Sequence, residues 1–339
     1  MGGAISGAVS QTWPPFVLVA GLLLIGAVVE ADGLFAAVGA RLERMPGGPV
    51  ALLAALLGLE ALVTAVLNLD TAAVFLTPIL LHAARQRDCD ERPFLYGALF
   101  VANGASLLLP GSNLTNLIVL AHEPLSGADV ARRMVLPWLV VVALTVAFLA
   151  LVFRLRHEGG NPTEPPPLRL GVGAAATLAA TGLLLALHNA ALPVLAVGLA
   201  AVALRRLRPA IGVPVLAALF LVTAALGTLA RRWHGPAHVL RHLDGPATAA
   251  VAAVAAVLVN NLPAAALLSA QRPPHPLELL LGLDLGPNLA VTGSLSAYLW
   301  YRAARGTGAR PSFRVSSALG LVLVPVTLAA ALLALRVTA

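Results

Sequence analysis

A short polar stretch inside a long apolar one is the feature that most constrains this sequence. Residues 68–78 read Asn-Leu-Asp-Thr-Ala-Ala-Val-Phe-Leu-Thr-Pro, with an amide, a carboxylate and two hydroxyls. Residues 50–67 before them are apolar except for Glu60 and Thr64. Polar groups at the depth of lipid hydrocarbon are costly unless protein or trapped water satisfies them. The stretch is therefore predicted to be the tip of a membrane-embedded helical hairpin, with its polar groups turned toward protein.

The second half of the chain repeats this pattern. Residues 260–265 (Asn-Asn-Leu-Pro-Ala-Ala) lie 192 positions after residues 68–73 and share the Asn and the Ala-Ala pair. Two further apolar stretches are broken by polar residues, at 110–116 and 284–294, and each holds a Gly-Ser pair, 182 positions apart. Paired broken segments in the two halves of a chain are typical of the substrate site of a secondary transporter.

Composition limits the class of protein and its partners. Of the 339 residues, 59% are hydrophobic and 11% are charged, which is typical of a polytopic protein embedded in a lipid bilayer. All 22 basic side chains are arginine, so the chain lacks the lysine of a P-loop and would need a soluble ATPase subunit as partner to use ATP. The net charge of +7 is attributed to loop arginines that set topology, and no nucleic acid is expected as a partner. A single cysteine excludes a multi-thiol metal site, and no metal or cofactor is expected.

These observations predict an all-α polytopic membrane protein with two inverted repeats, each containing a helical hairpin and a broken transmembrane helix. The first repeat, residues 1–153, comprises a span at 14–40, a hairpin at 49–84, a broken helix at 94–121 and a span at 131–153. A linker at 154–167 and connecting spans within 168–209 lead to the second repeat, residues 210–339. Its span, hairpin, broken helix and closing span are placed at 210–230, 246–271, 277–301 and 313–335.

Arginine placement predicts the topology. If both motif segments are hairpins, the loops on one side hold 15 arginines and those on the other hold 7; if each segment crosses once, the split is 11 to 11. Because arginine accumulates in cytoplasmic loops, the hairpins are favoured. The linker at 154–167 and Cys89 are then cytoplasmic, and the amino terminus lies outside the inner (plasma) membrane. Re-entrant and fully crossing hairpins have the same parity, so both stay open.

Four motifs carry a resemblance to a known family. They are Asn-Leu-Asp-Thr at 68–71 with Leu-Thr-Pro at 76–78, Ala-Ser-Leu at 105–107 with Ser-Asn-Leu-Thr-Asn at 112–116, Asn-Asn-Leu-Pro at 260–263, and Asp-Leu-Gly-Pro at 284–287 with Gly-Ser-Leu at 293–295. Over residues 16–153 and 246–335 the chain resembles the arsenical-pump permeases and NhaD-type sodium/proton antiporters. These belong to the ion transporter superfamily, which also includes divalent-anion and citrate carriers. Asn103 stands where this family has an acid, and the amino end is short.

The resemblance implies alternating access around the hairpin tips and leaves a homodimer open. It favours efflux of arsenite or antimonite, driven by the proton gradient or the membrane potential. Sodium/proton exchange and sodium-coupled carboxylate transport are the alternatives on the same scaffold. From other classes, an intramembrane hydrolase lacks its expected motifs in this sequence, and a structural subunit would not need paired polar breaks.

The candidate site residues are of two kinds. Neutral hydrogen-bonding groups in the tips and breaks are predicted to bind substrate, and a neutral trihydroxide such as arsenious acid needs only such donors and acceptors: Asn68, Thr71, Ser112, Asn113, Thr115, Asn116, Asn260, Asn261, Thr292 and Ser294. Asp70, Asp284 and Glu60 are acids in apolar surroundings and are predicted to handle the coupling ion. Asp70 is favoured because it is closest to a tip. The alternative roles are capping of a helix for the two aspartates and a hydrogen bond within the hairpin for Glu60.

Overall fold

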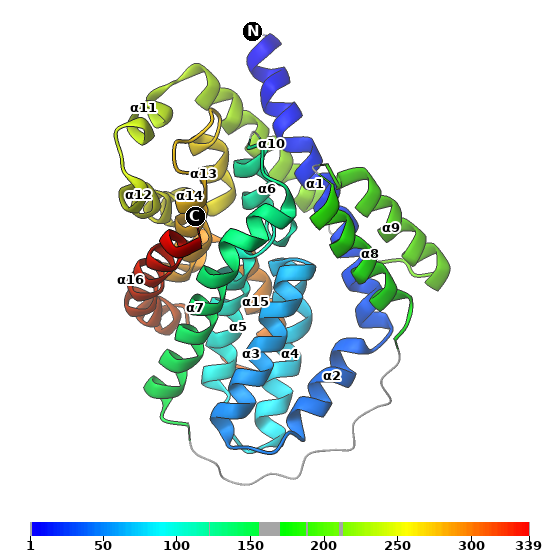
Figure 1. Cartoon of the computed structure of the whole chain (residues 1–339). Coiled ribbons are helices and arrows are strands. Elements are labelled where there is room, and N and C mark those ends of the chain that lie inside the picture. The colour runs from blue at the N-terminus through cyan, green and yellow to red at the C-terminus, as the bar shows by residue number, and fades with distance from the viewer. Residues whose placement is uncertain (1, 122, 156–169, 188, 210–212, 339) are drawn as a thin grey trace.

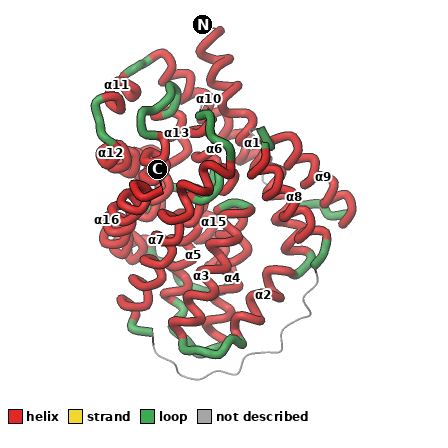
Figure 2. The backbone as a smooth tube through the Cα atoms, viewed as in Figure 1, coloured by secondary structure: helices red, strands yellow, loops and turns green. Residues whose placement is uncertain are grey.

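The structure is a computed structural model that describes residues 2–121, 123–155, 170–187, 189–209 and 213–338. Every regular element in these ranges is a helix, as Figure 2 shows, and the predicted all-α fold is confirmed. Most of the predicted linker at 154–167 lies outside the described residues.

The first half contains a hairpin followed by a broken helix (Figure 1). Proline starts the hairpin at α3, and an Asn68 side chain that accepts a hydrogen bond from the Thr71 amide starts its second arm, α4. The break consists of two short 3₁₀ turns, of which the second begins at Pro110. The elements are α3 (Pro49–Val66), α4 (Leu69–Gln86), α5 (Arg92–Gly104), η1 (Ala105–Leu107), η2 (Pro110–Ser112), α6 (Leu114–Leu120) and α7 (Gly127–Phe153).

The second half repeats this order. Its first span is bent by 70° between α10 and α11, and a shorter hairpin and a second broken helix follow. The elements are α10 (Val213–Arg232), α11 (Gly235–Arg241), α12 (Gly245–Val259), α13 (Asn261–Leu268), α14 (Pro276–Leu285), η3 (Gly286–Leu289), η4 (Val291–Gly293), α15 (Leu295–Gly306) and α16 (Phe313–Thr338). Two helices of 15 residues, α8 (Val172–Ala186) and α9 (Ala191–Arg205), connect the halves.

The first helix differs from its prediction. The predicted span at 14–40 is replaced by α1 (Gly2–Ala31) and α2 (Leu34–Glu43), which are separated at Gly33 with a left-handed φ of 71°. α1 runs through Pro14 and Pro15, because neighbouring groups in a membrane protein can satisfy the carbonyls that an internal proline leaves free. It ends where the Asp32 carboxylate turns away to accept from the Gly173 amide.

Packing between the two halves is reciprocal. The second arm of the first hairpin, α4, packs against α15, and the second arm of the other hairpin, α13, packs against α6. The turn η1 contacts α14, while η3 contacts α5, and α7 and α16 pack against each other. By length and composition, α1, α3, α7 and α16 can each cross a membrane, and α10 with α11 can form a fifth, bent span within the described residues. The protein is therefore a polytopic membrane protein in which the two broken helices meet.

Hydrogen bonds at the two ends of the molecule group the loops as the arginine count predicts. At one end, Arg85 donates to the Thr307 carbonyl, which joins the base of the first hairpin to the loop before α16. At the other end, Arg272 forms a two-pronged ion pair with Glu123, which joins the base of the second hairpin to the loop before α7. The two hairpin bases thus lie at opposite ends, as expected for inverted repeats.

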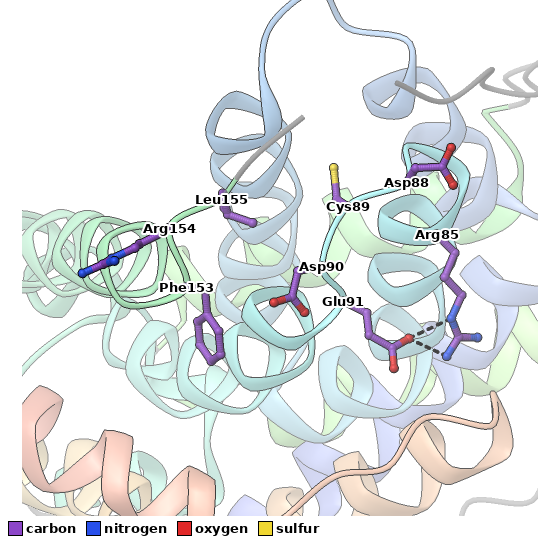
Figure 3. Close-up of a pocket in the computed structure, with 8 residues that line it drawn as sticks. All are labelled: Arg85, Asp88, Cys89, Asp90, Glu91, Phe153, Arg154 and Leu155. Atoms are coloured by element: carbon purple, nitrogen blue, oxygen red, sulfur yellow. Dashed lines mark hydrogen bonds and ion pairs between the residues drawn. The ribbon is translucent and has the colours of Figure 1, made fainter. Parts of the chain in front are cut away.

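A surface pocket marks the end that is predicted to be cytoplasmic. Figure 3 shows its lining residues, Arg85, Asp88, Cys89, Asp90, Glu91, Phe153, Arg154 and Leu155. Arg85 pairs with Glu91, and Arg92 pairs with Asp90. Partial burial acts to raise the pKa of Asp90, but hydrogen bonds and attraction to Arg92 outweigh it and hold that pKa below its usual value.

We expect Cys89 to be labelled from the cytoplasm only. It lies in the loop between α4 and α5, on the side with the larger number of arginines, and a membrane-impermeant maleimide should therefore miss it in intact cells. The same reagent should label it in inverted vesicles, and Cys89→Ser protein serves as the background. Labelling in intact cells at the vesicle level would show that the topology is reversed.

Candidate functional site

A buried network of hydrogen bonds joins the two broken helices. Its members come from six elements: Asn103 on α5, Ser106 on η1, Asn113 at the start of α6, Asp284 on α14, Asn288 on η3, and Ser294 with Ser296 at the start of α15. None is more than 5% exposed. These residues are called the cross-repeat network below.

One end of the network is a carboxylate held by an amide from the other half. The Asn113 side chain donates to one oxygen of Asp284 at 2.8 Å, and Asp284 is fully buried. The Asn113 oxygen meanwhile accepts from the Thr115 amide and caps α6, which fixes the direction of the side chain. The second Asp284 oxygen has no hydrogen-bond partner among the described residues.

The other end is the reciprocal arrangement, with an amide in place of the acid. The Asn103 side chain donates to Asn288 at 2.8 Å and accepts from the Ser296 hydroxyl at 3.0 Å. Asn288 in turn donates to the Phe100 carbonyl. Ser294, which caps α15, bonds the Ser296 hydroxyl at 2.8 Å. The amino ends of α6 and α15 thus each contact the broken helix of the opposite repeat.

Ser106 connects the two ends. Its hydroxyl donates to the Asn103 carbonyl at 2.7 Å and lies 3.4 Å from the Asn113 amide nitrogen. Its own carbonyl accepts from Asn116 at 2.7 Å and also from the Ser112 hydroxyl. These bonds satisfy backbone groups that the break in the helix leaves free, which allows irregular backbone to lie deep in the protein.

The electrostatics of this network favour a cation. It contains one carboxylate and no basic side chain. The carboxyl ends of α5 and α14 and the amino ends of α6 and α15 all reach it, so the partial charges of the helix ends oppose one another and the carboxylate is the one full charge in the network. A buried carboxylate whose neighbours Asn113, Ser106 and Asn116 are all neutral is costly unless a proton or a cation compensates its charge.

The hairpin tips lie beside the network without being bonded to it within the part of the chain described. In the first tip, Asn68 caps α4, while Thr71 packs against Gly26 of α1. Asp70, in the first turn of α4, is partly exposed. In the second tip, Asn260 has a left-handed φ of 73° and donates to the Thr292 carbonyl. Its neighbour Asn261 is buried, whereas Thr292 is exposed.

The structure therefore divides the predicted site residues. Ser112, Asn113, Asn116, Ser294 and Asp284 share one set of hydrogen bonds, and Thr115 is buried next to them in sequence. The hairpin-tip residues form two separate groups, one at each tip. Glu60 lies alone on α3, fully buried, and neither of its oxygens has a partner among the described residues.

Four network residues were not among the predicted site residues: Asn103, Ser106, Asn288 and Ser296. The repeat offset could have found two of them. The shift of 182 positions that aligns the two Gly-Ser pairs also aligns Ser106 with Asn288, and Gly104 with Gly286. The sequence marks Asn103 only as a position where the resembling family has an acid, although its amide can both donate and accept, as this position requires.

Metal-binding side chains do not cluster in the residues the structure describes: no group of three His, Cys, Asp or Glu residues could hold a metal ion there. The site offers amide, hydroxyl and carboxylate groups, which suit a small oxygen-rich solute or a hard monovalent cation.

Comparison with known proteins places the chain in a transporter family. The sequence profile of the citrate transporter family (CitMHS) matches residues 2–281, most of the chain. Among solved structures, the fold is similar to that of the YdaH transporter of Alcanivorax borkumensis, which is described as having an unusual topology, with a TM-score of 0.60. The two chains are 15% identical, and the match covers 98% of this chain and 87% of the other. Neither comparison supports arsenite as the substrate. The chain belongs to the citrate transporter family, and it is a membrane-embedded secondary transporter rather than an enzyme.

Proposed function

We propose that this protein carries a small carboxylate anion across the membrane together with a cation. The observation that carries the proposal is the buried Asp284, which has only neutral polar neighbours in a network without any basic residue. An anion that approached this carboxylate alone would be repelled, whereas a proton or sodium ion bound there removes the repulsion. The family description, citrate transporter, supports a carboxylate as the partner of that cation.

The geometry suggests how the cation and the anion depend on each other. With a cation on Asp284, the amides of Asn113 and Asn116 and the hydroxyls of Ser112 and Ser294 are the groups available to carboxylate oxygens. All four now bond protein groups, Asn113 across the repeats to Asp284 and the other three within their own repeat, so substrate must replace these bonds. Binding of both solutes and rearrangement of the two repeats are thereby linked, as a gradient-driven carrier requires.

A neutral metalloid acid, arsenious or antimonous acid, is the second candidate. It is supported by the four motifs shared with arsenical-pump permeases and by the absence of arginine from the cross-repeat network. A neutral trihydroxide would need no cation on Asp284 to bind. This difference in cation dependence separates the two candidates. Neither candidate requires an ATPase subunit or a homodimer.

Uptake by proteoliposomes of the purified chain tests the proposal. We expect labelled citrate or a related carboxylate to accumulate only when an inward sodium or proton gradient is imposed, with protein-free liposomes as control. Arsenite should not compete for this uptake. Arsenite transport that persists without any cation gradient, together with no carboxylate uptake under any gradient, would favour the metalloid candidate.

A further inference from the structure

A second buried polar group lies in the first hairpin, away from the cross-repeat network. Glu60 and Thr64 are four residues apart on α3, so their side chains share one face of the helix. Both are fully buried. α3 ends at Val66, and Asn68 at the hairpin tip lies in extended backbone beyond it. Glu60 and Thr64 therefore lie on the half of α3 that is nearer to the tip.

The oxygens of this pair are not used by the protein itself. Neither Glu60 oxygen has a hydrogen-bond partner in the described part of the chain, and the Thr64 hydroxyl also lacks one. Some buried threonines in these helices use their own backbone: the hydroxyls of Thr77, Thr145 and Thr223 donate to the carbonyl four residues earlier at 2.6–2.7 Å. The hydroxyls of Thr71, Thr115 and Thr248 lack a partner among the described residues, as that of Thr64 does, but only Thr64 shares a helix face with an unpartnered carboxylate. The Thr64 hydroxyl is thus free to bind a ligand beside the carboxylate.

In the part of the chain that the structure describes, no charged side chain compensates Glu60. The elements that pack against α3 are α2, α4, α5, α7 and the turns η1 and η2. Their ionisable residues are Arg41, Glu43, Asp70, His82, Arg85, Arg92, Tyr96, Asp129, Arg132 and Arg133. Within the described residues, none of them forms a hydrogen bond or ion pair with Glu60. A buried carboxylate in this position must be neutralised from outside the protein.

We propose that Glu60 and Thr64 form a second site for a monovalent cation, either a proton on the carboxylate or a sodium ion held by the carboxylate and hydroxyl oxygens. The three unpartnered atoms are all oxygens, the ligands that hard cations prefer. The site is separate from Asp284, which lies on α14 in the other repeat. A chain with both sites binds two cations, and uptake of a singly charged substrate would then carry net positive charge.

Cation binding to the purified protein tests the site directly, without a substrate. We expect each wild-type protein molecule to bind one more cation than a Glu60→Gln molecule. This cation is measured either as bound radioactive sodium or as a proton released in a pH titration. Thr64→Val should keep this equivalent but weaken its affinity about tenfold, because one oxygen ligand or hydrogen bond is lost. Thr145→Val, which removes an equally buried hydroxyl that is already bonded to its own helix, is the matched control.

The sodium and proton measurements distinguish the two cations, and size-exclusion profiles report folding. If Glu60→Gln protein does not fold, the change in affinity in Thr64→Val decides the question. An unchanged cation stoichiometry in folded Glu60→Gln, or equal effects of Thr64→Val and Thr145→Val, would overturn the proposal. The role of this second cation in coupling rests on the proposed function. Binding of the cation at Glu60 does not rest on that function. If the cation binds but no carboxylate is transported, the proposed function is wrong and the proposed cation site still stands.

Discussion

Replacing Asp284 with Asn is expected to abolish accumulation of substrate against its gradient. The variant side chain has the same shape and can still accept the hydrogen bond from Asn113, so the cross-repeat network should persist. It can no longer bind a proton or sodium ion by charge. The ratio of internal to external substrate should therefore fall to about 1, since no coupling free energy between cation and substrate remains.

Counterflow in proteoliposomes measures this loss separately from binding. Substrate exchange between two equal pools needs no gradient, and we expect Asp284→Asn protein to retain it. An imposed sodium or proton gradient should have no further effect on this variant. Loss of exchange as well as accumulation in a folded variant would mean that Asp284 is needed for binding itself and would leave its coupling role without support.

Asp70→Asn is the matched comparison, because sequence alone favoured Asp70 as the coupling acid. Asp70 is partly exposed in the first turn of α4 and does not bond to the cross-repeat network within the described residues. An acid there also suits the positive end of the helix, which gives it a structural reason to be present. We therefore expect Asp70→Asn protein to keep accumulation. If Asp70→Asn protein loses accumulation while Asp284→Asn protein keeps it, Asp70 is the coupling acid, as the sequence predicts.

The helices and their breaks could be predicted because polar residues in apolar sequence leave few alternatives. Pro110, Asn113 and Asp284 mark places where a membrane helix cannot continue without help from its neighbours. The structure has a helical hairpin and a broken helix in each half. Such local rules failed at Pro14, where the predicted span begins but α1 continues through the proline from Gly2.

The contacts between residues of the cross-repeat network could not be predicted from local sequence patterns. Asn113 and Asp284 are 171 residues apart, and Ser296 and Asn103 are 193 apart. Both contacts depend on how the two repeats are placed relative to each other, which no local pattern contains. For the same reason the sequence favours Asp70, which is near a tip, over Asp284, which the fold brings into the cross-repeat network.

The largest structural effect is expected at Gly320, where α16 lies against the break of the second repeat. A Cβ atom at Gly320 would overlap the carbonyl oxygen of Asn288, with the Asn288 carbonyl carbon at 2.8 Å. In the first repeat, α7 contacts the break through a side chain instead. The Trp138 indole donates to the Ala105 carbonyl at 3.1 Å. Small residues let backbones approach closely between membrane helices, and Gly320 has this role.

Gly320→Ala is therefore expected to destabilise the protein and to impair transport together. The clash is with backbone, so α16 or η3 must move, at a cost of about 3 kcal/mol in the free energy of unfolding. Movement of η3 displaces Asn288 and with it the bonds to Asn103 and Phe100. Thermal unfolding in detergent and uptake in proteoliposomes measure the two effects. Gly182→Ala is the control, because that helical glycine has open space around its Cβ position. If Gly320→Ala unfolds at the wild-type temperature and transports normally, the close packing of α16 on η3 does not hold the network in place.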